Sequence, residues 1–211
     1  MSLKEKEKKE LSDLSAYRNV FITTFTGKRF YFFNVTPDDI DIEDIIHSLC
    51  NSCRYNGHSN RFYSVAEHSL LTAKIAPREF ELAALLHDAA EAYITDIPRP
   101  LKQLLNEYTD GLLRNMEEHI MTAIHQKFGV ETYGDQVKQI KMADNSALFV
   151  ESHALFDPEA IADWVYGERF DDTQMLDRFS LDEYGPSSCV LECRFRDALK
   201  LHIPELQYIK E

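Results

Sequence analysis

The sequence predicts a mostly α-helical bundle with a small N-terminal β-hairpin. Long stretches repeat apolar residues at the i, i+3, i+4 and i+7 positions, whereas two short segments near the N-terminus are rich in β-branched and aromatic residues. A chain of 211 residues buries roughly 70% of its extended surface on folding, which suits one domain. Because no repeat or long linker divides it, we expect a single domain over residues 16–211, after a polar, disordered end at residues 1–15.

The hairpin is expected from residues 20–24 and 29–33, with Thr26 and Gly27 between the strands. Glycine adopts the positive φ angles that tight turns need, and the flanking residue types suit a pleated surface. Nearly all of the chain after this hairpin has helical spacing.

The expected helices have recognisable starts. Thr36 and Pro37 form a cap before a helix that extends to about residue 50, and Ser64 starts the next helix with Glu67 at the capping-box offset. An alanine-rich third helix is expected over residues 82–93. The remaining helices are expected at residues 112–128, 137–156 and 188–202.

Composition excludes several classes of protein. A net charge of −13 argues against a general binder of nucleic-acid polymers, because affinity for phosphate backbones comes from basic residues. The longest apolar run spans five residues, 82–86, against the roughly 20 that cross a bilayer, so no membrane segment is expected. The first ten residues lack the apolar core of a secretory signal, which favours a cytoplasmic location.

The most informative segment is HDAAEAYITDIPRPLK, which begins at His87. A helix through it, stopped by Pro98 and Pro100, would place His87, Asp88 and Glu91 on one face. These groups follow the apolar run LAALL, where a buried carboxylate needs a counter-ion. A divalent cation is the natural counter-ion.

Two further residues extend this cluster to a possible ligand set. His68 lies near the start of one expected helix, and Asp144 lies within an apolar stripe of another. Together with His87 and Asp88 they offer two imidazoles and two carboxylates, a set that suits Mn, Co, Zn, Fe or Mg without choosing among them.

The pattern His68, His87-Asp88, Asp144 resembles that of the HD-domain metal-dependent phosphohydrolases. HDAAEAYITDIPRPLK is similar to the corresponding segment of the 5′-deoxynucleotidases, whereas RYNGHSNRFYSVAEHS and TFTGKRFYFF are more similar to small bacterial and phage members. The resemblance covers about residues 20–155. It implies an HD-domain helical bundle with one essential divalent metal ion, a nucleotide as small-molecule substrate, and a homodimer.

The resemblance also implies roles for individual residues. His68, His87, Asp88 and Asp144 would bind the metal, and Glu91 would handle the proton of the attacking water. The remaining implied residues are Asp96 near the leaving oxygen or sugar hydroxyl, Arg54 and Lys102 on the phosphate, and Tyr55 stacking on the base or sugar. Asp96 can equally cap the turn before Pro98, and Tyr55 can equally be a core residue.

Other functions stay open at this point. A deoxynucleoside triphosphate triphosphohydrolase would use the same four metal ligands and Glu91, and would release triphosphate. A di-iron oxygenase would need further histidines, for which His119 and His125 are available, and a degenerate domain would only bind a partner. A structural zinc site is a weaker alternative, with Cys50, Cys53, His47 and His58 as ligands and Cys189 and Cys193 as a second pair.

Overall fold

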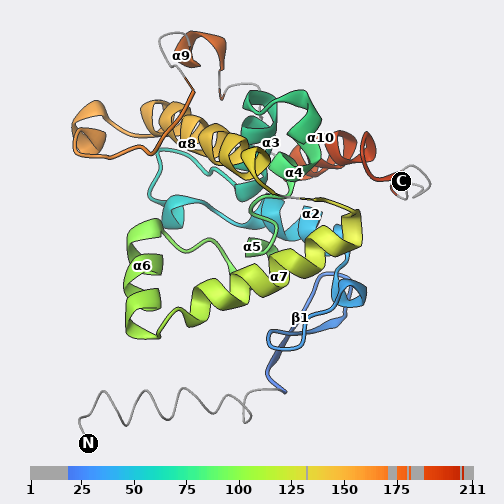
Figure 1. Ribbon diagram of the computed structural model, residues 1–211. Helices are drawn as coiled ribbons and strands as arrows, with labels where there is room; N and C mark the ends of the chain where they lie inside the picture. Colours follow the sequence, from blue (N-terminus) through green and yellow to red (C-terminus); the bar gives the residue numbers. More distant parts are fainter. Residues whose placement is uncertain are drawn as a thin grey trace, which may run out of the picture.

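The computed structural model describes residues 19–131, 133–170, 175–179, 181, 188–204 and 206 (Figure 1). The mostly helical architecture with one two-stranded antiparallel sheet confirms the predicted fold class. The end predicted to be disordered, residues 1–15, lies outside the described residues. Figure 1 shows α3 and α8 in the upper half of the molecule and α6 and α7 in the lower half, with α5 between them.

The hairpin forms where it was expected. Strands β1 (Phe21–Thr23) and β2 (Arg29–Tyr31) pair antiparallel. The turn is tied to the helical body, because the Thr26 amide and hydroxyl donate to the buried carboxylate of Asp44 at 2.7 and 3.1 Å.

Helix α2 (Ile42–Asn51) starts later than the sequence indicated. Its N-cap is Asp41, whose side chain accepts a hydrogen bond from the Glu43 amide at 3.0 Å. The expected cap, Thr36, instead starts the short 3₁₀ turn η2 (Pro37–Asp39). The prediction merged two elements because a proline at the first position suits either kind of helix.

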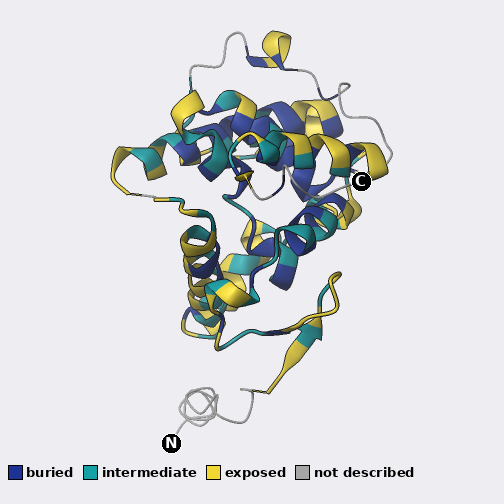
Figure 2. Ribbon diagram, turned by 90° about the vertical axis from the view of Figure 1, so that its right-hand side faces the viewer, coloured by how far each residue is buried: buried dark blue, intermediate teal, exposed yellow. Residues whose placement is uncertain are grey.

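Helices α3 (Val65–Ile75) and α8 (Asp135–Leu155) pack against each other in the centre of the fold. The predicted capping box of α3 is confirmed, with the Ser64 and Glu67 side chains each bonding the backbone of the other. Figure 2 shows the buried residues concentrated where the helices meet.

The prediction of one continuous helix over residues 82–93 is wrong. Helix α4 (Glu81–Leu85) ends just before His87, and α5 (Glu91–Ile94) starts just after Asp88. The Ala84 carbonyl accepts a hydrogen bond from the His87 ring at 2.8 Å, and the next backbone bonds join residues three apart. These tighter turns rotate the following side chains relative to a regular helix. His87, Asp88 and Glu91 therefore do not share the face of a single helix.

The two prolines begin a helix that the sequence did not predict. Pro98 is the N-cap of α6 (Arg99–Tyr108), and Pro100 lies in its first turn. A proline there loses no hydrogen bond, because first-turn amides have no partner within the helix. Lys102 is therefore a helical residue.

Helix α7 (Leu112–Phe128) ends at Gly129, as the sequence predicted. The chain continues after α8 to α10 (Ser188–Lys200), which packs on α2 through the ion pair of Arg196 with Glu43. The short elements are η3 (Tyr55–Gly57), η4 (Arg78–Phe80), η5 (Pro158–Ile161) and α9 (Met175–Arg178). Within the described part of the chain, no helix combines the length and apolarity needed to cross a bilayer.

Candidate metal centre

Three side chains from different elements converge at the centre of the fold. His68 comes from α3, His87 from the turn between α4 and α5, and Asp144 from α8. The two Nε2 atoms lie 3.2 Å apart, and Asp144 Oδ1 lies 3.2 Å from that of His68 and 4.0 Å from that of His87. One donor atom from each residue lies within 4.8 Å of the others, so this group could hold a metal ion.

Asp88, the fourth predicted ligand, is close to the same point. Its Oδ2 lies 3.5 Å from His68 Nε2 and 3.3 Å from His87 Nε2. The structure therefore brings together all four side chains named from the sequence. His87 and Asp88 belong to the turn between α4 and α5, however, and not to a continuous helix.

Hydrogen bonds on the far side of each imidazole orient the two rings. His87 Nδ1 lies 2.8 Å from the Ala84 carbonyl, and His68 Nδ1 lies 2.5 Å from Glu151 Oε1. A carbonyl oxygen can only accept a hydrogen bond, so His87 Nδ1 carries a hydrogen and donates it, and in the neutral ring Nε2 then has the lone pair. Such outer contacts are the usual support of histidine ligands in metal sites.

Glu151, which the sequence did not predict as a site residue, holds the His68 ring in this orientation. Its side chain is fully buried and accepts hydrogen bonds from the hydroxyls of Tyr55 at 2.5 Å and Tyr63 at 3.1 Å. Arg54 Nε lies 3.4 Å away. Burial alone would raise the pKa of Glu151, but the charges of His68 and Arg54, with hydrogen bonds from His68 and Tyr55, lower it to about 2.

The surroundings of His68 favour its protonated form by raising the pKa of the ring. Burial and the Arg54 charge both lower the pKa of His68, but Glu151 and Asp144 outweigh them and raise it to about 10. The pKa of Asp144 is well below its ordinary value: burial opposes ionisation, and the hydrogen bond and charge of His68 outweigh it.

Glu91 is a buried carboxylate next to this group. It is 7% exposed, and its Oε2 has no hydrogen-bond partner. Burial, followed by the charges of Asp88 and Asp96, raises the pKa of Glu91 well above its ordinary value of 4.5. Such a group can exchange a proton nearer neutral pH than an exposed carboxylate.

Asp96 does not cap the following helix. The N-cap of α6 is Pro98, and no side chain forms a capping hydrogen bond there. Burial raises the pKa of Asp96, Arg54 opposes this, and Asp88 adds to it. Asp96 therefore belongs electrostatically to the candidate site.

Arg54 and Lys102, the predicted phosphate contacts, lie beside carboxylates of the candidate site. Arg54 Nη1 is 3.5 Å from Asp88 Oδ2, and Lys102 Nζ is 3.8 Å from Glu91 Oε1 and 2.6 Å from Glu117 Oε1.

The ring of Tyr55 packs on Phe156, with 5.1 Å between centroids, while its hydroxyl bonds Glu151. Tyr55 therefore supports the candidate metal centre through Glu151, and stacking on a substrate stays a prediction.

A third cation, Lys141, was not predicted. Its Nζ lies 2.5 Å from Asp144 Oδ2, one turn along α8. Its side chain is 57% exposed, so the ammonium group can move toward a ligand at the centre without leaving a buried position.

The donor set fits a divalent cation. Imidazole nitrogens and carboxylate oxygens are ligands of Zn, Fe, Co and Mn, and carboxylates also suit Mg. With both imidazoles neutral, carboxylates outnumber cations around the centre, so a dication would offset part of the negative charge. The carboxylates are Asp88, Glu91, Asp96, Glu117, Asp144 and Glu151, and the cations are Arg54, Lys102 and Lys141.

Among the described residues, no other group of histidine, cysteine and acidic side chains meets this spacing. The alternative zinc site lacks support, since Cys50 is buried, Cys53 is exposed and neither belongs to a group. His119 and His125, which a second iron would need, are not part of the group either.

Fold and site together define a helical protein with a candidate histidine–aspartate metal centre. No protein-family model matches the chain. It is 34% identical over 155 residues to the uncharacterized protein RCAP_rcc00048 of Rhodobacter capsulatus, covering 68% of this chain and 77% of that protein. The chain belongs to the family of that protein. It is also 50% identical over 110 residues to the uncharacterized protein YfdR of Escherichia coli, a match that spans 52% of this chain and 59% of YfdR.

Proposed function

We propose that the protein is a metal-dependent nucleotide phosphohydrolase, and specifically a 5′-deoxynucleotidase that converts a deoxynucleoside monophosphate to deoxynucleoside and phosphate. The observation that carries the proposal is the group His68, His87 and Asp144, within mutual reach and beside the buried Glu91. Its pattern in the sequence resembles that of the HD-domain phosphohydrolases.

The proposed mechanism divides the work among the described residues. A divalent ion held by His68, His87, Asp88 and Asp144 would lower the pKa of a water molecule and polarise a phosphoryl oxygen. Glu91 accepts the proton of the attacking water, because its Oε2 is free and its raised pKa suits proton exchange.

Positive charge on two sides of the centre would hold the phosphate. Arg54, fixed between Asp88 and Glu151, presents a guanidinium fork that suits bidentate phosphate contact. Lys102 and Lys141 approach from α6 and α8. Asp96 would bind the leaving oxygen or the sugar hydroxyl. Because the cations lie on two sides of the centre, a longer phosphate chain can also be held, which keeps triphosphate release as the second candidate.

The experiment is a panel of ribo- and deoxynucleotide mono-, di- and triphosphates, incubated with chelator-treated protein and Mn, Co, Zn or Mg. Phosphorus NMR identifies the products. We expect inorganic phosphate from deoxynucleoside monophosphates only when a metal is present. Triphosphate as product would replace the specific proposal with the second candidate, and release of neither product from any nucleotide would contradict both.

A further inference from the structure

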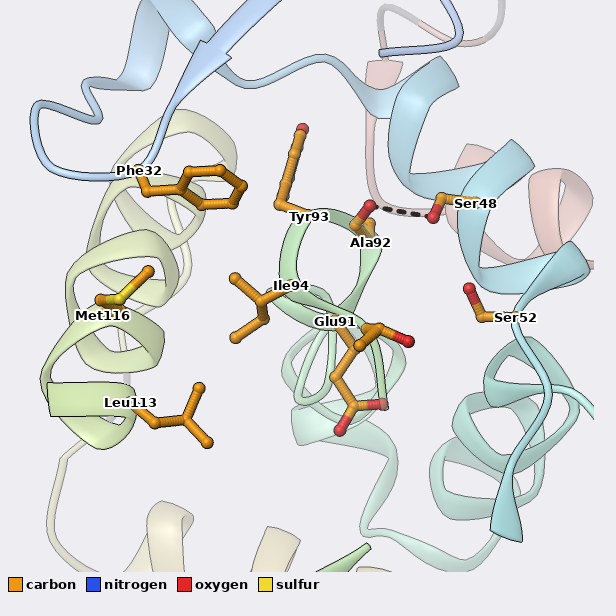
Figure 3. Close-up of a pocket in the computed structure, with 10 residues that line it drawn as sticks. Phe32, Ser48, Ser52, Glu91, Ala92, Tyr93, Ile94, Leu113 and Met116 are labelled. Carbon is orange, nitrogen blue, oxygen red and sulfur yellow. Dashed lines mark hydrogen bonds between the residues drawn. The ribbon is translucent and has the colours of Figure 1, made fainter. Parts of the chain in front are cut away.

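A pocket of about 460 Å³ opens beside the candidate metal centre. Helix α5 and the following Thr95 contribute residues 91–95 to its lining. Ser48 of α2, Ser52 just after it, and Leu113 and Met116 of α7 line the rest with Phe32 (Figure 3). The size falls within the range of small-molecule sites, roughly 300–1,000 Å³.

Glu91 borders both this pocket and the candidate metal centre. In Figure 3 the Glu91 carboxylate lies at the end of the pocket opposite Phe32 and Tyr93. Glu91 is both buried and without a partner at Oε2. A ligand in the pocket therefore has one end beside the proposed reacting group and the other among aromatic side chains.

The lining excludes a phosphate chain from the pocket. None of the ten lining residues is a lysine, arginine or histidine, and the single carboxylate is that of Glu91. Burial raises the pKa of the Tyr93 phenol, so that group stays neutral. Within the lining an anionic group would find no counter-charge, whereas an uncharged ligand needs none.

The remaining lining suits a ligand with a planar apolar part and a hydroxylated part. Phe32, Ile94 and Met116 provide apolar contacts, and in Figure 3 Phe32 and Met116 lie farther from the Glu91 carboxylate than Ile94 does. Ser52 and Thr95 add hydroxyls to the lining. Aromatic rings bind nucleobases by stacking, and hydroxyl groups bond to sugars.

The backbone at Thr95 has an unusual conformation, with φ at 71° and ψ at 158°. A β-branched residue with positive φ is strained, and such strain persists mainly at ligand-binding and active sites. Here it marks the junction between the pocket residues of α5 and Asp96.

We infer that this pocket binds the nucleoside part of the substrate, with the base against Phe32 and Met116 and the sugar beside Ser52 and Glu91. Tyr55 does not line the pocket, so this placement replaces the stacking role that the resemblance implied for it. The identity of the ligand rests on the proposed function, in which the nucleoside is the leaving group. The phosphate then lies at the centre, among the cations.

Equilibrium binding of nucleosides to the metal-free protein tests the inference apart from catalysis. Deoxyadenosine and deoxycytidine are titrated in the presence of chelator and followed by calorimetry or ligand-observed NMR. Met116→Trp fills the pocket from α7, and Asn115→Trp adds the same bulk at the adjacent exposed position. We expect binding to weaken at least tenfold in Met116→Trp and to change less than twofold in Asn115→Trp.

Circular dichroism shows whether the variants fold, and Leu113→Phe replaces Met116→Trp if the latter does not. Equal nucleoside binding by wild type and the pocket variant would overturn the inference, as would displacement of the nucleoside by tripolyphosphate.

The two proposals fail separately. Phosphate release without measurable nucleoside binding overturns this inference alone. Nucleoside binding without hydrolysis of any nucleotide supports the pocket and overturns the proposed function.

Discussion

Asp144 and Glu151 contact opposite nitrogens of the His68 ring, Asp144 Oδ1 at 3.2 Å from Nε2 and Glu151 Oε1 at 2.5 Å from Nδ1. Seven positions separate the two carboxylates in α8, close to two turns of helix, so both lie on one face. A single rigid helix therefore supplies a candidate ligand and also fixes the orientation of another.

Removal of the Glu151 charge is expected to weaken metal binding while leaving the candidate ligands in place. Loss of a carboxylate that supports a histidine ligand typically costs 10–100-fold in metal affinity, and we expect this range for Glu151→Gln. Competition with a chromophoric chelator measures the affinity.

The matched control is Asp135→Asn, at the exposed first turn of the same helix, which should bind like wild type. Tyr63→Phe removes one hydrogen bond from Glu151 and keeps its charge, so its effect should be smaller. Wild-type affinity in Glu151→Gln would show that the carboxylate does not support the centre.

Metal binding should stabilise the fold, because the candidate ligands come from separate elements. An ion at 100 times its Kd adds about 2.7 kcal/mol to the free energy of unfolding. We expect Mn²⁺ or Co²⁺ to raise the Tm of wild type and of His119→Ala, but not that of His87→Ala. An equal rise in His87→Ala would place the ion elsewhere.

Lys141 is expected to bind substrate phosphate. Lys141→Ala should raise KM for the nucleotide several-fold with a smaller change in kcat, because the lost contact is mainly electrostatic. Lys138→Ala removes a lysine of equal exposure that pairs with Glu168 instead, and should leave KM unchanged. Similar KM values in both variants would assign no role to Lys141.

The pH dependence of activity should report Glu91. Its pKa lies above the ordinary 4.5, so the ionised base is lost on acidification at a higher pH than for an exposed glutamate. Activity should therefore rise with pH along a limb whose midpoint exceeds 4.5.

Asp96→Asn removes a charge that raises the pKa of Glu91, and should move the midpoint of this limb to lower pH. Glu91→Gln should remove most activity and the limb with it. An unshifted midpoint in Asp96→Asn would show that the Asp96 charge does not influence the pKa of the catalytic base.

Periodicity in the sequence predicted the long helices, because α3 starts with a capping box, α7 ends at a glycine and Pro158 follows the end of α8. Periodicity did not predict the break between α4 and α5. There the Ala84 carbonyl bonds to the His87 ring, and this bond interrupts a segment with helical composition. Periodicity also failed at α6, where prolines stand in a first turn rather than after a last one.

The four candidate ligands could be named because histidine and aspartate in an apolar context need a partner, and because their pattern resembles a known one. Glu151 and Lys141 could not be named in this way. The partners of Glu151 lie up to 96 positions away in the sequence, so only folding shows that its carboxylate is buried among them. Its spacing of seven from Asp144 within one helix was the available signal.

Metal content per chain tests the central claim most directly. Chelator-treated protein is dialysed to equilibrium against Mn²⁺ or Co²⁺, and the bound metal is measured by elemental analysis in wild type and in Asp144→Ala. We expect one ion per chain in wild type and a large loss in the variant, with both proteins folded by circular dichroism. No ion in wild type, two ions per chain, or full occupancy in Asp144→Ala would contradict a single cation shared by these helices.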